Sequence, residues 1–405
     1  MSLMVFSAAA ANLSPVFSVV PRHKFSPTFP ERIQRLHHFG YRSNPNHCFK
    51  PITQPCRNSL ISDKFPAVGA RSTGPVAPDH LIEVVKTAAL TGAQVVMDAV
   101  NKPRNITYKG LTDLVTETDK MSEAAILEIV NKNFEDHLIL GEEGGIIGDA
   151  ASDYLWCIDP LDGTTNFAHG YPSFAVSVGV LYRGRPAAAA VVEFVGGPMC
   201  WNTRTFSATT GGGAFCNGER IQVSETNQVE RSLLVTGFGY DHDDAWATNI
   251  DLFREFTDVS RGVRRLGAAA VDMCHVALGI VEAYWEYRLK PWDMAAGVLM
   301  VEEAGGAVSR MDGGKFCVFD RSVLVSNGVL HEKIAPNIRI NLLNMLFLDS
   351  LPTKKVFYAM ILIYIRFVSR DVILHEMHIV LQITMILSLH PLDQFWHCFL
   401  INLQN

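Results

Sequence analysis

A buried strand that ends in two carboxylates constrains this chain more than any other stretch. Residues 154–158 form an apolar run of the length expected for a buried strand. Asp159 and Asp162 follow it, and Gly163 and Thr164 then open a segment suited to the start of a helix. Two such carboxylates repel each other unless a cation lies between them. Because Mg²⁺ prefers oxygen ligands, the pair predicts a magnesium site.

A helix start directly after this pair adds a second functional signal. Backbone N–H groups at a helix N-terminus can bind an anion such as phosphate. Metal ligands and an anion site within residues 156–167 predict phosphoryl transfer or phosphate hydrolysis. For the Asp-x-x-Asp pair alone, the alternative is a turn with an aspartate cap and no chemistry.

Composition sets the outer limits. The 405 residues are enough for one large domain or two coupled ones, and a hydrophobic content of 48% permits a sizeable core. The net charge of −6 excludes a strongly basic, nucleic-acid-binding character. The eight cysteines are scattered and never form Cys-x-x-Cys, so neither a zinc site nor a redox motif is predicted.

The N-terminal segment, residues 1–75, has the composition of an organelle transit peptide. It contains nine Lys and Arg residues but only two acids, Glu31 and Asp63, and no persistent hydrophobic period. The first ten residues are uncharged, which favours a chloroplast (stromal) over a mitochondrial destination. The alternative is a disordered basic tail without a targeting role.

Helical spacing of apolar residues begins near residue 80. It predicts one helix over residues 80–100 and a second over 119–134, the latter with Ala124, Ile126, Leu127 and Val130 facing inward. A mostly antiparallel meander is expected from about residue 174 to 216, followed by a second α/β segment from Arg231.

Three further acids occupy element ends. Asp119 begins the second predicted helix, Glu142 follows a short apolar strand, and Asp293 heads a helix that ends near residue 303. Each one alone can be explained as a helix cap or as part of a solvated turn. Helix capping is a much weaker explanation when these three acids and Asp159 and Asp162 are considered together.

Four motifs resemble those of the inositol monophosphatase family, the lithium-sensitive, Mg²⁺-dependent phosphatases. Asp-Pro-Leu-Asp-Gly-Thr-Thr-Asn-Phe at 159–167 and Trp-Asp-Met-Ala-Ala-Gly at 292–297 are similar to its two signatures. Asp-Leu-Val-Thr-Glu-Thr-Asp at 113–119 and Gly-Glu-Glu at 141–143 precede them at the family's spacing. The resemblance covers roughly residues 80–330 and looks closest to chloroplast-targeted plant members.

The resemblance implies a fold and a domain organisation. The fold would be an α/β layered, five-layer αβαβα sandwich, usually a homodimer. We expect a transit peptide at 1–75, a catalytic domain at 78–333 and an atypical hydrophobic extension at 334–405.

The resemblance also implies residue roles. Two or three Mg²⁺ would be held by Glu142, Asp159, Asp162, Asp293 and the Leu161 carbonyl. The catalytic residues would be Asp119, Thr164 and Glu142, with Thr164 and Asp119 aligning a metal-activated water. The substrate would contact Gly163, Thr164, Gly267, Ala268, Ala269, Glu286 and Asp293.

The expected activity is hydrolysis of inositol monophosphate and related sugar phosphates. L-galactose 1-phosphate and histidinol phosphate remain open, because family members act on each. The Gly-Thr-Thr-Asn-Phe sequence after Asp162 argues against a bisphosphate nucleotidase and a fructose bisphosphatase. The complete set of acids argues against a non-catalytic binding protein.

The resemblance ends near Ile334. The extension contains charge-free runs at 356–365 and 377–389. Both are shorter than the ~20 residues that a membrane-spanning helix requires. We therefore expect no membrane association and interpret 334–405 as an aberrant C-terminus; the alternative is a membrane-associated hairpin.

A fluorescent fusion tests the transit peptide. Residues 1–80 joined to a fluorescent protein are expected to enter chloroplasts and to be cleaved, because basic residues far outnumber acids there. A fusion that begins at residue 76 is the control and should remain in the cytosol. Cytosolic fluorescence from the first fusion would contradict the assignment.

Overall fold

Two β-sheets with helices between and outside them form the part of the chain that is described. The computed structural model describes residues 71–102, 106–108, 114–239 and 243–335. The expected transit peptide and C-terminal extension lie almost wholly outside the described residues.

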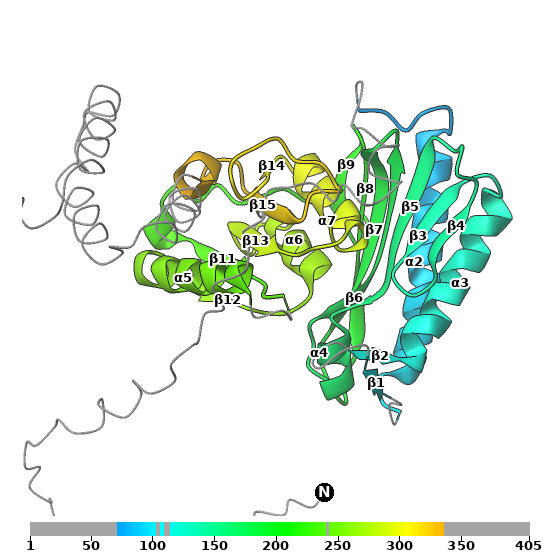
Figure 1. The fold of residues 1–405 in the computed structure, drawn as a ribbon, viewed down its shortest axis with the longest axis horizontal. Helices are drawn as coiled ribbons and strands as arrows, with labels where there is room; N and C mark the ends of the chain where they lie inside the picture. The colour runs from blue at the N-terminus through cyan, green and yellow to red at the C-terminus, as the bar shows by residue number, and fades with distance from the viewer. Residues whose placement is uncertain (1–70, 103–105, 109–113, 240–242, 336–405) are drawn as a thin grey trace, which may run out of the picture. The chain divides into compact units, whose positions relative to one another are not determined.

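The larger sheet carries the strand with the two carboxylates in its interior (Figure 1). β5 (Tyr154–Asp162) is buried along its whole length. It pairs in parallel with β3 (Leu138–Gly141) and antiparallel with β6 (Phe174–Tyr182). The order of the eight strands is β10-β9-β8-β7-β6-β5-β3-β4. The others are β4 (Gly145–Gly148), β7 (Arg185–Val195), β8 (Asn202–Thr209), β9 (Gly213–Cys216) and β10 (Glu219–Arg220).

The expected meander is confirmed, because β6 to β10 pair antiparallel in sequence order. A smaller sheet follows with the order β12-β11-β13-β15-β14, in which β11, β12 and β13 are parallel. Its strands are β11 (Leu233–Thr236), β12 (Gly262–Arg264), β13 (Ala283–Tyr287), β14 (Ala307–Ser309) and β15 (Ser322–Ser326). A two-stranded ribbon, β1 (Ile106–Tyr108) and β2 (Leu114–Thr116), precedes α3.

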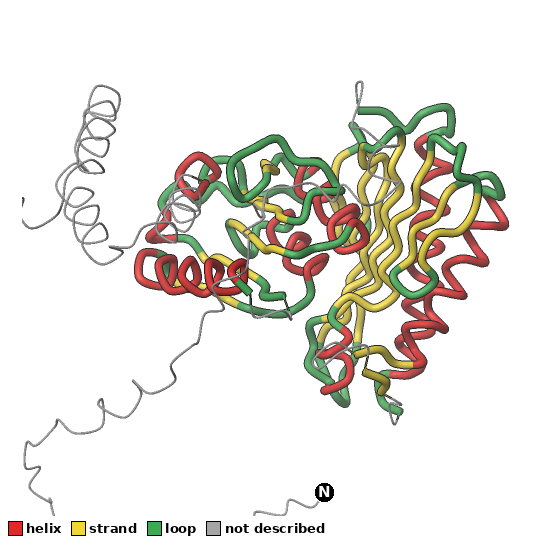
Figure 2. The backbone as a smooth tube through the Cα atoms, viewed as in Figure 1, coloured by secondary structure: helices red, strands yellow, loops and turns green. Residues whose placement is uncertain are grey.

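Helices complete five layers, as expected for an αβαβα sandwich (Figures 1 and 2). α2 (Pro78–Ala99) and α3 (Glu117–Asn133) cover one face of the larger sheet. α6 (Ala269–Ala277) and α7 (Pro291–Glu303) lie between the sheets, and α5 (Asp244–Val259) packs on the other face of the smaller sheet. The short helices are α4 (Thr164–His169) and the 3₁₀ turn η2 (Val229–Arg231).

Alternation along the strands assigns side chains to separate cores. On β5, Leu155 and Cys157 face the core between the sheets, whereas Trp156 and Ile158 face α2 and α3. This is the two-residue period of an extended strand that is covered on both faces.

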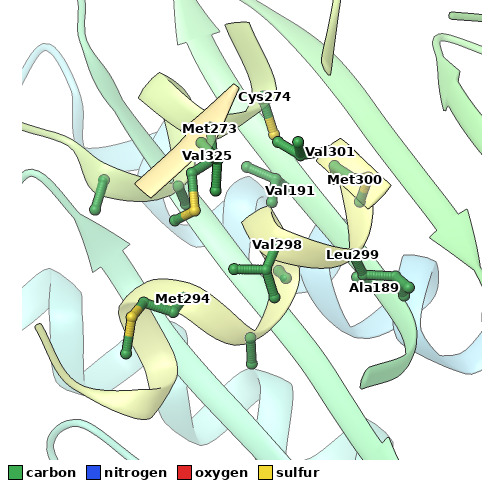
Figure 3. Packing of buried hydrophobic residues seen from close by; sticks show 14 of the residues in the cluster. Ala189, Val191, Met273, Cys274, Met294, Val298, Leu299, Met300, Val301 and Val325 are labelled. Atoms are coloured by element: carbon green, nitrogen blue, oxygen red, sulfur yellow. The ribbon is translucent and has the colours of Figure 1, made fainter. Parts of the chain in front are cut away.

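The central helix α7 is apolar on all sides, because both sheets and α6 surround it. Met294, Val298 and Met300 of α7 belong to the same buried cluster as Met273 and Cys274 of α6 (Figure 3). α7 packs closely against β6 at Gly179, which has no side chain. A Cβ added there would lie 2.9 Å from the backbone nitrogen of Ala296 in α7.

The prediction for the inward face of α3 is partly wrong. Ile126 and Val130 are buried as expected, but Ala124 is exposed. Ser122 and Glu123 are buried instead. The apolar period placed this helix correctly along the sequence, but it could not detect that polar side chains occupy part of its inner face.

Candidate active site

Asp159 and Asp162 lie at the buried end of β5, on either side of an irregularity in its pairing with β6. Their exposed fractions are only 3% and 7%. Asp159 Oδ1 accepts a hydrogen bond from the Leu161 amide at 3.0 Å. Asp162 accepts bonds from the amides of Ala269 and Ala270 at 3.1 and 2.8 Å, at the start of α6. Asp162 therefore joins the larger sheet to the central helical layer.

Burial and mutual repulsion perturb these two acids. The pKa of Asp159 is raised well above its usual value, first by burial and then by the negative charges of Glu142, Asp162 and Asp293. Burial raises the pKa of Asp162 to about 6, although its bonds to the α6 amides oppose the shift. The acids predicted from separate motifs therefore interact electrostatically in the folded chain.

Glu142 and Asp293 reach this cluster from different elements. Glu142 follows β3, and its N–H donates to the Ile158 carbonyl of β5 at 3.1 Å. Asp293 is the third residue of α7 rather than its N-cap, and its Oδ2 accepts from the Lys290 amide at 2.6 Å. Burial raises the pKa of Asp293, and repulsion from Glu142 and Asp162 adds to the effect.

Asp119 lies next to Thr164, the first residue of α4. It is the third residue of α3 and completes a capping box with Thr116, the N-cap residue. Asp119 Oδ2 accepts from the amide and the hydroxyl of Thr116 at 2.8 and 2.5 Å. Its Oδ1 lies 3.1 Å from the Thr164 hydroxyl, which is also 3.0 Å from the Leu161 carbonyl. Thr164 has one hydroxyl proton, so it can donate to one of these oxygens at a time.

The turn after Asp162 packs against the start of α6. Gly163 adopts a positive φ of 86°, and a Cβ added there would lie 2.9 Å from the Ser173 carbonyl and 3.1 Å from Ala268 Cβ. Gly267 also has a positive φ, of 84°. These glycines allow the two segments to approach each other. Ala269 lies beside them, but its amide is already bound to Asp162.

Asn166 also connects these two segments, and the sequence analysis assigned it no role. Its side-chain amide donates to the carbonyls of Ser173 and Leu266, at 2.6 and 2.7 Å. The sequence feature that could have identified Asn166 is its position within the 159–167 motif.

Glu286 projects from β13 of the smaller sheet. The Tyr284 hydroxyl donates to its Oε2 at 2.5 Å. Burial raises the pKa of Glu286 to about 7, opposed by the Tyr284 bond and by the positive charge of Arg265. Its charge in turn raises the pKa of Asp293, so Glu286 borders the acid cluster on the side of the smaller sheet.

The cluster fits a hard divalent cation in its chemistry. It offers carboxylate oxygens and the Leu161 carbonyl oxygen, which are ligands that Mg²⁺ prefers. The charged groups that shift the pKa of Asp159 are all acids, so none of them supplies a positive charge that would balance the cluster. Within the described residues, no three acid, histidine or cysteine side chains already converge closely enough to enclose a metal ion. Several of the carboxylate oxygens accept hydrogen bonds from backbone amides, which orient the side chains.

Comparisons with known proteins agree with this fold. The inositol monophosphatase family model matches residues 77–342. The chain is 69% identical over 343 residues to the chloroplastic phosphatase IMPL1 of Arabidopsis thaliana, across 83% of this chain and 92% of the relative. It is 41% identical over 255 residues to an inositol-1-monophosphatase of Synechocystis sp., across 63% and 87%.

A solved structure shows the same fold. The inositol monophosphatase from Anabaena (Nostoc) sp. PCC 7120 aligns with a TM-score of 0.57 and 39% identity, across 64% of this chain and 94% of that one. The chain therefore belongs to the inositol monophosphatase family and is a phosphatase, as its motifs predicted. This family acts on small phosphorylated substrates and is generally metal-dependent. Among the described residues, no helix has the length and apolarity needed to cross a membrane.

Magnesium is expected to stabilise the protein more at about pH 8 than at about pH 5. The pKa of Asp162 is raised by folding, so its contribution to the stability of the metal-free protein is full below its unfolded pKa. That contribution is lost as the pH rises through about 6, and Glu286 acts in the same way through about 7. Metal binding requires ionised carboxylates and offsets the loss.

The measurement is the Tm at both pH values, with Mg²⁺ or with a chelator. Asp159→Asn serves as the control, because removing one charge should reduce the Mg²⁺-induced shift. An equal shift in wild-type protein at the two pH values would contradict the prediction.

Proposed function

We propose that this phosphatase hydrolyses inositol monophosphate (of the myo-inositol 1-phosphate type) and related sugar phosphates to the free polyol and phosphate, using Mg²⁺. The observation that carries the proposal is the group of mutually repelling carboxylates gathered from β3, β5 and α7. Asp159 illustrates it, because three other acids raise its pKa. A structural role alone does not account for that repulsion, which a bound cation would relieve.

We propose that two or three Mg²⁺ are held by Glu142, Asp159, Asp162, Asp293 and the Leu161 carbonyl. When bound, Mg²⁺ supplies Lewis-acid stabilisation of phosphate and alkoxide oxygens and lowers the pKa of a water nucleophile. The protein contributes fixed positions for the ligands. The Leu161, Lys290 and α6 amides hold three of the carboxylates by hydrogen bonds.

Thr164 and Asp119 are proposed to orient the attacking water, and Glu142 completes the catalytic set. Thr164 Oγ1 lies within hydrogen-bond distance of Asp119 Oδ1, and Thr116 holds the other oxygen of Asp119. This fixes the Thr164 hydroxyl at the start of α4. The amides of Gly163 and Thr164 are proposed to bind the phosphate, as helix N-termini do.

The alcohol part of the substrate is proposed to lie against Gly267, Ala268, Ala269, Glu286 and Asp293. Glu286 is the group suited to polyol hydroxyls, because a carboxylate accepts charge-assisted hydrogen bonds. Tyr284 already donates to one of its oxygens, which restricts its orientation.

We also propose the expected organisation for the whole chain. Residues 1–75 would be a chloroplast transit peptide, 78–333 the catalytic domain, and 334–405 an atypical extension. The name of the Arabidopsis relative, a chloroplastic phosphatase, supports chloroplast localisation, and we propose the stroma. A homodimer is proposed from the family resemblance alone.

A phosphate-release assay tests the function. The purified protein is supplied with inositol 1-phosphate, L-galactose 1-phosphate, histidinol phosphate and a 3′,5′-bisphosphate nucleotide, with Mg²⁺ or a chelator. We expect Mg²⁺-dependent turnover, highest on the polyol phosphates, and inhibition by Li⁺. Asp159→Asn should lower turnover by at least ~3 orders of magnitude. Highest turnover on histidinol phosphate would replace the proposed substrate class, and no turnover on any would contradict the function.

Glu286→Gln tests substrate selection. The change keeps the shape of the side chain but removes its charge, so each lost charge-assisted hydrogen bond should cost about 1.5–3 kcal/mol. For a polyol phosphate, kcat/KM is expected to fall roughly 10- to 150-fold. Hydrolysis of p-nitrophenyl phosphate should change little, because it has no hydroxyls for Glu286 to bind. Equal losses on both substrates would place Glu286 in the chemistry instead.

A further inference from the structure

One face of α3 presents three buried polar side chains to the site. Asp119, Ser122 and Glu123 have exposed fractions of 1%, 0% and 4%. Their spacing of three and four residues places them on the same face of the helix. Each one contacts a different segment: Asp119 contacts Thr164, Ser122 donates to the Pro160 carbonyl at 2.9 Å, and Glu123 contacts the turn after β3.

The turn after β3 is built around the carboxylate of Glu123. Glu123 Oε1 accepts the N–H of Glu143 at 3.0 Å. A Cβ added at Gly141 would lie 2.2 Å from this oxygen, and a Cβ added at Gly144 would lie 2.9 Å from Oε2. Both glycines of the Gly-Glu-Glu-Gly sequence therefore leave the space that the Glu123 carboxylate occupies.

This arrangement fixes Glu142 from both sides. Its own N–H donates to the Ile158 carbonyl of β5, and the next N–H along the chain donates to Glu123. A buried carboxylate is costly unless it is hydrogen-bonded, and Glu123, which is 4% exposed, accepts the Glu143 N–H. An apolar side chain could fill the same volume at lower cost but could not accept the Glu143 N–H, so the hydrogen bond to the turn is the property that Glu123 adds.

We propose that Glu123 is a positioning residue that holds Glu142 in place as a magnesium ligand. The inference rests on the proposed function, because it takes Glu142 as a ligand. Glu123 acts through the backbone of the 141–144 turn rather than by touching substrate or metal. Residues that orient metal ligands in this way typically change metal affinity 10- to 100-fold when they are removed.

The test measures Mn²⁺ binding by calorimetry on the full-length protein without substrate, so that the readout is separate from activity. Glu123→Ala is expected to weaken binding about 10- to 100-fold. Glu123→Gln should stay within about 3-fold of wild type, because the amide oxygen still accepts the Glu143 N–H. Glu303→Ala is the matched control, since that carboxylate also binds turn amides, those of Gly211 and Gly213, at 2.9 Å each. It should leave the affinity unchanged.

A double-mutant cycle makes the mechanism specific. Gly141→Ala inserts a Cβ where the Glu123 carboxylate lies, so by itself it should weaken Mn²⁺ binding about as much as Glu123→Ala. In the Glu123→Ala background that space is open, and Gly141→Ala should add less than about 2-fold. Additive losses in the cycle would overturn the proposal.

Other outcomes also decide it. Unchanged Mn²⁺ affinity in Glu123→Ala would reduce Glu123 to a structural residue. A loss in Glu123→Gln as large as in Glu123→Ala would overturn the proposed role of the hydrogen bond, because the Gln amide oxygen can still accept the Glu143 N–H. If Glu123→Ala fails to fold, unchanged affinity in Gly141→Ala alone overturns the proposal. Wild-type protein that binds no Mn²⁺ would contradict the proposed function instead, and this result is distinct from the others.

Discussion

Repulsion between carboxylates at the buried end of β5 is the constraint on which the site depends. Asp159 and Asp162 are almost fully buried, and the charge of Glu142 acts on Asp159 from the neighbouring strand end. Ionised acids in such a place are unfavourable unless hydrogen bonds or a cation offset the repulsion. The amides of Leu161, Ala269 and Ala270 supply the hydrogen bonds. The remaining repulsion is what makes a cation favourable at this position.

The central helical layer brings the two sheets to one site. Asp162, from the larger sheet, binds the start of α6, and α7 carries Asp293 into the same cluster. α7 can lie this close to β6 because Gly179 has no side chain. Glu286, from the smaller sheet, borders the cluster on the other side. Glu286 therefore approaches from the smaller sheet, Asp159 and Asp162 from the larger sheet, and Asp293 from the helical layer between them.

The buried face of α3 contacts the segments around the site through three polar residues, Asp119, Ser122 and Glu123. Each reaches a separate segment, so one rigid helix aligns the start of α4, the end of β5 and the turn after β3. Apolar side chains there would bury more area but would not set the relative positions of these segments. The helix therefore contributes to geometry at a cost in apolar packing.

In the sequence alone, the hydrophobic period predicted element types, and the resemblance of its motifs to those of a known family implied the layered fold, the family and the acids of the proposed site. Both signals are local properties of the chain. The hydrophobic period placed the buried strand at 154–158 correctly, but it wrongly assigned Ala124 to the core. Glu123 and Asn166 gained no role, because their partners are 20 and 100 residues away along the chain. Only the tertiary structure decided which amides hold the acids, since those contacts arise when distant strands and helices pack together.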